Sequence, residues 1–217
     1  GFLDLGFEKS GYEVELVNEF SPSFIRAYQY SREKMGLRKP KYGHSNIDVN
    51  EFLTSRSEEL AEYMKDARSD GSLIGFIGGP PCPDFSVAGK QKGRDGDNGK
   101  LSMSYIRLII AQKPDFFLFE NVKGLWRTAK HREYYEELKA LLSDAGYLMT
   151  DRLTNSLEFG AAQDRDRILL FGVAARILEG SETGIQDFPW SKYMKYFWFR
   201  NQFIINKFFI KGCDIII

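Results

Sequence analysis

Short apolar runs recur along this chain and predict the strands of a buried sheet. The runs at 12–20, 72–79 and 115–122 are rich in Val, Ile, Leu and Phe and are bounded by polar or glycine-rich segments. Two further runs, 147–157 and 167–174, flank the polar stretch "EFGAAQDRD". We expect these last two runs to form a hairpin of antiparallel strands.

Amphipathic segments lie between the apolar runs and predict helices. One helix is expected to begin at "SPSF", where Ser21 suits the N-cap position and Pro22 the first helical position. Others are expected over 50–68, 101–112 and 131–146, the last with its charged residues on the outer face.

Alternation of buried strands with helices predicts a doubly wound α/β fold. Its sheet should be mostly parallel, covered by helices on both faces, and end in the antiparallel hairpin. We expect residues 1–190 to form one domain that lacks its first strand. Residues 191–217 are rich in aromatics and isoleucine without a clear period. We expect poor order there.

Composition and charge narrow the class of protein. Hydrophobic residues make up 43% and charged residues 28%, as in an ordinary globular protein, and 30 basic residues balance 30 acidic ones. Any nucleic-acid surface must therefore be local. The two cysteines favour neither a disulfide framework nor a zinc site, so we expect no metal. We see no membrane span and expect a cytoplasmic protein.

Chemically distinctive residues follow the predicted strands, where α/β sheets bind their ligands. Glu19 ends one strand, Cys82 follows the next in "GGPPCPDFS", and Glu120 ends the third in "FENV". A thiol and a carboxylic acid in one pocket predict covalent catalysis with proton donation. Arginines in "QDRDR" would favour the thiolate form. Flanking prolines fix the backbone that presents the cysteine.

These motifs, in this order, resemble those of the cytosine-5 DNA methyltransferases of prokaryotic type. "GGPPCPDFS", "FENV" and "QDRDRILLFG" resemble the catalytic motifs, and "GFLDLGFEKSGYEVELVNEF" resembles the cofactor region, cut after its first strand. "SVAGKQKG" resembles the mobile active-site loop. The resemblance covers residues 1 to about 190 and implies that residues 1–190 form a catalytic and cofactor-binding domain with a Rossmann-like fold that binds S-adenosylmethionine. It also implies that residues 191–217 are a remnant of, or link to, a target-recognition region, and that the protein is nucleoid-associated.

The resemblance also implies roles for individual residues. Cys82 matches the nucleophile that adds to carbon 6 of a flipped-out cytosine, and Glu120 matches the acid that protonates ring nitrogen 3. Arg165 and Arg167 match the arginines that brace this site. The implied cofactor-binding residues are Gly1, Glu19, Phe20, Asp48, Val49, Gly79, Pro81 and Leu101. The implied DNA contacts are Ser86, Lys90, Lys92, Arg94 and Asn121.

The partner implied is duplex DNA that contains a cytosine target. The protein would be a monomer, or would pair with a second chain that supplies the recognition domain. We expect the 217 residues to be inactive or poorly active alone, because no recognition region is identifiable after Trp190.

Several alternatives stay open. Cys82 alone would suit a small core residue, and Asp48 alone would suit a helix N-cap. A transfer RNA cytosine-5 methyltransferase shares the motif series, although it usually carries a Cys-Phe-Thr stretch that does not occur in this sequence. A truncated or degenerate member that binds DNA or a nucleoside without turnover is the alternative outside the enzyme class.

Overall fold

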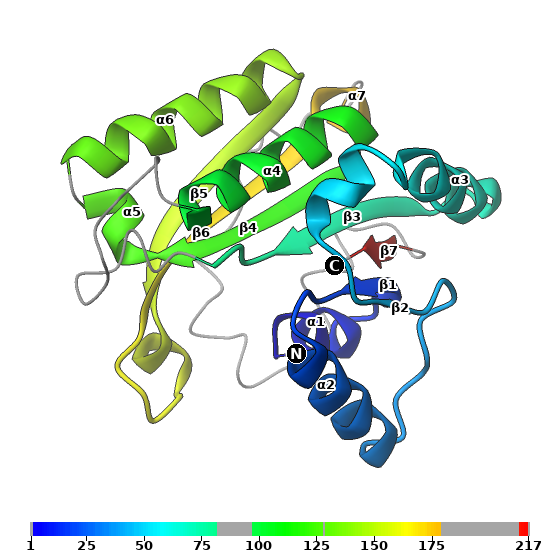
Figure 1. Cartoon of the computed structure of the whole chain (residues 1–217). Coiled ribbons are helices and arrows are strands. Elements are labelled where there is room, and N and C mark those ends of the chain that lie inside the picture. Colours follow the sequence, from blue (N-terminus) through cyan, green and yellow to red (C-terminus); the bar gives the residue numbers. More distant parts are fainter. Residues whose placement is uncertain (1, 82–96, 128, 179–212, 217) are drawn as a thin grey trace. The chain divides into compact units, whose positions relative to one another are not determined.

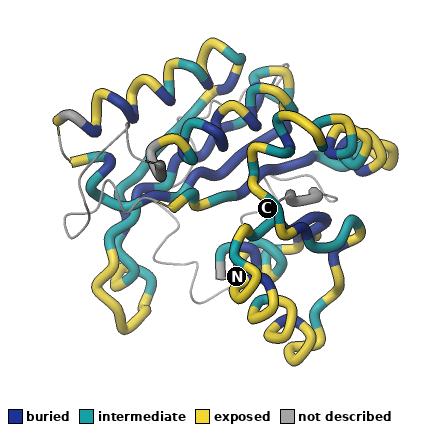
Figure 2. Tube along the Cα trace, viewed as in Figure 1, coloured by how far each residue is buried: buried dark blue, intermediate teal, exposed yellow. Residues whose placement is uncertain are grey.

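The computed structural model describes residues 2–81, 97–127, 129–178 and 213–216 (Figure 1). The chain divides into two compact units. Unit 1 comprises Gly1–Ile77 with Gln202–Ile217, and unit 2 comprises Gly78–Asn201. In each unit the buried segments follow the strands, whereas the helices alternate buried and exposed residues (Figure 2). The predicted boundary near residue 190 stays a prediction.

Unit 1 is built on parallel strands. Strand β1 (Glu13–Asn18) pairs with β2 (His44–Ser45) on one side and with β7 (Cys213–Ile216) on the other, and β7 also pairs with β3 (Leu73–Gly78). All three pairings are parallel. Strands β1 and β3 confirm two predicted runs. Strand β7 was not predicted, because its residues belong to the aperiodic stretch 191–217.

The helices of unit 1 differ partly from prediction. Helix α2 (Pro22–Lys34) begins after an N-cap at Ser21, as predicted, and α1 (Phe2–Lys9) precedes β1. The helix predicted over 50–68 is instead divided into the 3₁₀ helix η1 (Val49–Leu53), α3 (Ser57–Ala67) and η2 (Arg68–Asp70). Thr54 ends η1 and its hydroxyl donates to the Asn50 carbonyl, the kind of local bond that competes with a continuous helix.

A buried charge cluster joins α1 to α2. Arg32 of α2 lies 3.2 Å from Asp4 and also pairs with Glu8, both on α1, while the Tyr28 hydroxyl donates to Asp4. Arg32 and Asp4 are both buried. Because breaking a buried ion pair leaves an uncompensated charge, this cluster holds α1 against α2.

Unit 2 is built on antiparallel strands. Strand β6 (Asp166–Ala174) lies between β4 (Phe116–Val122) and β5 (Tyr147–Asn155), so the predicted hairpin is confirmed. Helices α4 (Asp97–Gln112) and α6 (Ala129–Asp144) lie over one face of these strands (Figure 1). Shorter elements complete the unit: α5 (Lys123–Arg127), η4 (Ser156–Phe159) and α7 (Ala175–Leu178).

Close packing of aromatic side chains determines where glycine is required in the core of unit 2. Phe116, Phe117 and Phe119 of β4 are all buried. A Cβ atom on Gly172, the residue opposite Phe117, would lie only 2.2 Å from the Phe117 ring. Tyr105 of α4 is also buried, and its hydroxyl donates to the Leu118 carbonyl at 3.0 Å. This dense packing fixes β4, which carries Glu120 at its end.

The predicted α/β fold class is confirmed: the strands of unit 1 pair in parallel, and unit 2 contains the antiparallel hairpin. Within the described ranges, no helix is both long and apolar enough to cross a membrane.

Candidate functional site

Glu120 and Arg167 form an ion pair at the end of β4. Glu120 lies opposite Leu169 and Val122 lies opposite Arg167, so Glu120 and Arg167 are diagonal neighbours on one face of the antiparallel ladder. The Nε atom of Arg167 lies 2.7 Å from Oε1 of Glu120, and both side chains are about one-quarter exposed, at 23% and 26%. The structure thus brings together two of the four predicted catalytic residues.

The backbone of Gly79 closes the other side of the Glu120 carboxylate. A Cβ atom at position 79 would lie 2.7 Å from Oε2 of Glu120, closer than side chains tolerate. The neighbouring Gly78 lies equally close to the Tyr105 ring, where a Cβ atom would be 2.8 Å from Cε2. The segment that leads to Cys82 therefore passes directly against Glu120.

The turn that carries the arginines is held by the end of β5. The backbone nitrogen of Ser156 donates to the Arg165 carbonyl at 3.1 Å, and the Thr154 hydroxyl donates to the Arg167 carbonyl at 3.1 Å. Nη1 of Arg167 donates to the carbonyl of Asp166 at 2.7 Å. Arg165 is exposed, and within the described residues its side chain makes no hydrogen bond or ion pair.

Asp166, between the two arginines, accepts hydrogen bonds from side chains of two neighbouring elements, α5 and β5. Lys123, which follows β4, pairs with its Oδ2, and Asn155 donates to its Oδ1 at 2.9 Å. The bond from Lys123, together with that from Asn155 and the charge of Arg127, holds the pKa of Asp166 below its ordinary value. Asp166 is therefore a charged acceptor near neutral pH.

Asn121 differs from the other predicted DNA contacts in being buried. It is 2% exposed, and its Oδ1 accepts from the backbone nitrogen of Val122 at 2.7 Å. Its Nδ2 is buried without a hydrogen-bond partner among the described residues. A direct DNA contact by Asn121 stays a prediction, and this burial does not favour it.

In unit 1, the predicted cofactor residues lie where β1 and β2 end. Glu19 follows β1, and its Oε1 accepts from the backbone nitrogen of Ser21 at 2.8 Å. Phe20 is 71% exposed, an unusual state for a phenyl ring. Asn46, which follows β2, donates to the carbonyls of both Glu19 and Phe20, at 2.6 and 2.8 Å. Asn46 therefore fixes the backbone that presents these two side chains.

Asp48 is the N-cap of η1, so the capping role left open by the sequence is confirmed. Its carboxylate accepts from the backbone nitrogen of Asn50 at 2.8 Å. Val49 begins η1 and is half-buried. Pro81 is exposed, and Leu101 is half-buried in α4. Cofactor contacts by these four residues stay predictions.

Six predicted site residues lie outside the part of the chain that the structure describes: Gly1, Cys82, Ser86, Lys90, Lys92 and Arg94.

The chemistry of the described residues fits the predicted ligands. An exposed aromatic ring beside a carboxylate, at the carboxyl ends of parallel strands, suits a nucleoside, because the ring can stack on a purine and the carboxylate can accept from ribose hydroxyls. In unit 2, a partly exposed carboxyl held by a guanidinium suits a polar heterocycle that is bound and protonated.

Residues 1–197 match the sequence profile of the C-5 cytosine-specific DNA methylases. The chain belongs to this family. The resemblance inferred from "GGPPCPDFS", "FENV" and "QDRDR" is thereby confirmed.

Curated relatives and a solved structure support the family assignment. The chain is 51% identical over 197 residues to the type II methyltransferase M.NmeDI of Neisseria meningitidis, covering 90% of this chain and 46% of that protein. It is 36% identical to M.FnuDI of Fusobacterium nucleatum, covering 79% and 44%. A crystal structure of a prophage-encoded Escherichia coli protein, assigned as a DNA modification methyltransferase, is similar at 26% identity and a TM-score of 0.59, covering 82% and 44%. The chain spans less than half the length of these relatives.

Three residues of the site were missed by the sequence analysis: Asn46, Lys123 and Asn155. Each acts through a hydrogen bond to a residue distant in the sequence. Only Lys123 had a sequence signal, since it directly follows "FENV". Asn46 and Asn155 can be found only once the strand register is known.

Proposed function

We propose that this chain is the catalytic part of an enzyme that transfers a methyl group from S-adenosylmethionine to carbon 5 of cytosine in duplex DNA, as a component of a restriction-modification system. The observation that carries the proposal is the setting of Glu120. Arg167 pairs with one carboxylate oxygen and the Gly79 backbone lies against the other. Three residues span at most about 11 Å, so a thiol three positions after Gly79 is within reach of this carboxyl.

In the proposed reaction, the residues of the chain activate the cytosine ring. The Cys82 thiolate adds to carbon 6, and the Glu120 carboxyl donates a proton to ring nitrogen 3, which makes carbon 5 nucleophilic. When bound, S-adenosylmethionine supplies an electrophilic methyl group for carbon 5. Carbon 5 then loses its proton to water, ring nitrogen 3 returns its proton to Glu120, the double bond between carbons 5 and 6 re-forms, and the Cys82 thiolate leaves. Arg167 holds Glu120 in place, and the exposed Arg165 is available to the base carbonyl.

Glu19 and Phe20 are the residues proposed to hold the cofactor. The Glu19 carboxylate would accept from the ribose hydroxyls, and the Phe20 ring would stack on the adenine. Asp48 and Val49 would lie along the adenine edge. Cofactor contacts are also proposed for Gly1, Gly79, Pro81 and Leu101. DNA contacts are proposed for the polar and basic residues after Cys82, which are Ser86, Lys90, Lys92 and Arg94.

The same motif series would serve a transfer RNA substrate, so the substrate must be tested directly. DNA is favoured because the relatives at 51% and 36% identity are type II methyltransferases. A nucleoid-associated location and a monomeric or two-chain assembly remain predictions that accompany this proposal.

A chimera makes the proposal testable whatever lengths of sequence flank the catalytic part. In this chimera, residues 1–197 of the chain replace the matching segment of the Neisseria meningitidis relative. We expect the chimera to label duplex DNA with tritium from methyl-labelled S-adenosylmethionine. The same assay with transfer RNA should give no labelled product.

Two variants and a modified substrate test the assigned chemistry. Cys82→Ala should abolish labelling, and Glu120→Gln should reduce it by about 100-fold or more. DNA with 5-fluorocytosine should trap the unsubstituted enzyme covalently, because fluorine cannot leave carbon 5 as a proton does. Methylation by Cys82→Ala at the parent rate would refute the nucleophile. If transfer RNA is labelled and duplex DNA is not, the substrate is transfer RNA and the DNA assignment is wrong.

A further inference from the structure

We propose that Lys123, Asp166 and Asn155 form a cross-strand clamp that positions Arg167 against Glu120, a role that rests on the proposed function of Glu120. The clamp residues are positioning residues, because none of them is assigned to touch the substrate. They come from three neighbouring elements of unit 2, namely the start of α5, which directly follows β4, the start of β6 and the end of β5.

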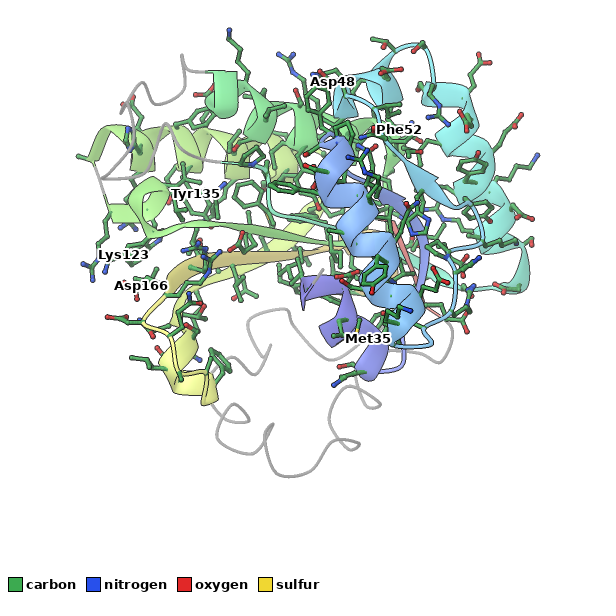
Figure 3. All side chains as sticks on the ribbon, turned by 60° about the horizontal axis from the view of Figure 1, so that its bottom comes forward. Met35, Asp48, Phe52, Lys123, Tyr135 and Asp166 are labelled. Atoms are coloured by element: carbon green, nitrogen blue, oxygen red, sulfur yellow. The ribbon has the colours of Figure 1, made fainter. Side chains whose placement is uncertain are left out.

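The three clamp residues meet where the strands of unit 2 end. Asn155 lies directly opposite Asp166 in the β5–β6 ladder. The β4–β6 ladder ends at the pair Val122 and Arg167, and Lys123, the first residue of α5, follows directly and pairs with the Asp166 side chain. Figure 3 shows the labelled side chains of Lys123 and Asp166 lying next to each other. Asp166 thus joins both ladders at the end of the sheet that carries the candidate site.

Asp166 passes this constraint to Arg167 through its own backbone. Nη1 of Arg167 donates to the Asp166 carbonyl at 2.7 Å, and Nε of the same guanidinium lies 2.7 Å from Glu120. The guanidinium is therefore held at two points, one of which is a carbonyl whose residue is fixed by Lys123 and Asn155. If the Asp166 side chain were released, the carbonyl could rotate and Arg167 would lose its second support.

Asn155 is itself fixed, which makes it a firm support for Asp166. Its Oδ1 accepts from the backbone nitrogen of Leu157 at 2.9 Å in a capping box with Glu158, at the start of η4. Its Nδ2 also donates to Asp164 at 2.7 Å. One amide side chain therefore connects the cap of η4 to the turn on which both arginines lie.

The test detects the Arg167–Glu120 ion pair through the NMR signal of the Arg167 Nε–H group, measured in the 217-residue chain. Arg167→Lys identifies the Arg167 signal by its loss, and Glu120→Gln shows where the signal lies when the pair is broken. We expect Asp166→Asn and Lys123→Met to move the signal toward the broken-pair position. Lys123→Arg, which keeps the cation, should leave it near the parent position.

Asp151 provides a matched control in the same unit. It also accepts from two side chains, Tyr135 at 2.9 Å and Lys139 at 3.0 Å, and its side chain is 25% exposed against 26% for Asp166. Asp151→Asn should lower the melting temperature to an extent similar to Asp166→Asn without moving the Arg167 signal. An unmoved signal in both Asp166→Asn and Lys123→Met, or equal shifts in Asp166→Asn and Asp151→Asn, would overturn the clamp.

Methyl transfer by the chimera gives a second readout. We expect Lys123→Met and Asp166→Asn to lower kcat about tenfold, with little change in KM for the cofactor. The reason is that the displaced group, the Glu120 carboxyl, acts on the base and not on the cofactor. If the chimera methylates nothing, the proposed function fails while the NMR result still decides whether the clamp positions Arg167. If the chimera methylates DNA but the Arg167 signal does not move in Asp166→Asn and Lys123→Met, the proposed function stands and the proposed clamp is wrong.

Discussion

Gly79 lies against the carboxylate of Glu120, with no room for even a methyl group between them: a Cβ atom would come within 2.7 Å of Oε2. Gly79→Ala should therefore displace Glu120 from Arg167 and lower methyl transfer by the chimera about tenfold or more. The thermal stability should change little, because the carboxylate is partly exposed and can swing outward.

Gly78→Ala is the informative comparison for Gly79→Ala. Its Cβ atom would strike the buried ring of Tyr105, which is fixed by a hydrogen bond to the Leu118 carbonyl. We expect this neighbouring substitution to cost about 1–3 kcal/mol of unfolding free energy. If both variants lose stability equally while activity per folded molecule is unchanged, the contact of Gly79 with Glu120 has no catalytic importance.

Replacement of Arg167 by lysine should not preserve activity, although the charge is kept. The guanidinium contacts Glu120 through Nε and the Asp166 carbonyl through Nη1, and an ammonium cannot reproduce both contacts in one geometry. We expect Arg167→Lys to lower kcat by about 100-fold in the chimera. Arg152→Lys, at a surface pair with Glu158, is the control and should retain the parent rate.

Asn46→Ala should weaken cofactor binding without affecting the chemistry of the base. Without the amide, the carbonyls of Glu19 and Phe20 lose a common donor, and the segment that presents both side chains is released. One such bond contributes about 1 kcal/mol, so calorimetry with S-adenosylmethionine should show roughly fivefold weaker binding. Thr54→Ala removes a comparable hydroxyl-to-carbonyl bond to Asn50 and should bind as the parent does.

The sequence predicted the elements with a strong hydrophobic pattern and missed those without one. The runs at 72–79 and 115–122 are buried strands β3 and β4 because apolar residues fill both faces. Strand β2 has only two residues, too few for any period. Strand β7 comes from an aperiodic stretch and is defined only by its pairing with β1 and β3.

In the candidate site, too, the sequence predicted some residues and missed others. The order of the motifs implied a site around Glu120 and Arg167, and the ion pair between them bears out their proximity. The bonds of Asn46 and Asn155 depend on which residues lie opposite each other, which no local pattern encodes. The burial of Asn121 was also hidden, because the strand residue after Glu120 points to the opposite face.

Gly172→Ala should destabilise unit 2 far more than glycine-to-alanine changes usually do. The added methyl would lie 2.2 Å from a ring carbon of Phe117, and the ring is fully buried against its neighbours. We expect a loss of about 3 kcal/mol or more, measured by urea unfolding. Gly6→Ala, in α1 with nothing within 4 Å of the new Cβ atom, should be neutral or stabilising. Equal effects of the two changes would contradict the packing described for β4 and β6.

His44 should make unit 1 less stable as the pH falls. Burial, with the charges of Arg32 and Lys39, lowers the pKa of His44, and its Nε2 is buried without a hydrogen-bond partner among the described residues. The folded state therefore favours the neutral ring, which packs edge-on against Tyr28. Above a pH of about 6.5, the ordinary histidine value, the ring is neutral in both states and contributes no pH dependence.

Below that pH the unfolded chain binds the proton more readily, so the unfolding free energy falls until the pH passes the folded pKa. Urea unfolding between pH 7.5 and 5 should show this decline in the parent chain and a flatter profile in His44→Phe, which keeps a ring beside Tyr28. His131 is present in both proteins, so its contribution cancels in the comparison. Parallel profiles for the two proteins would show that the ring at position 44 is free to take up its proton in the folded state.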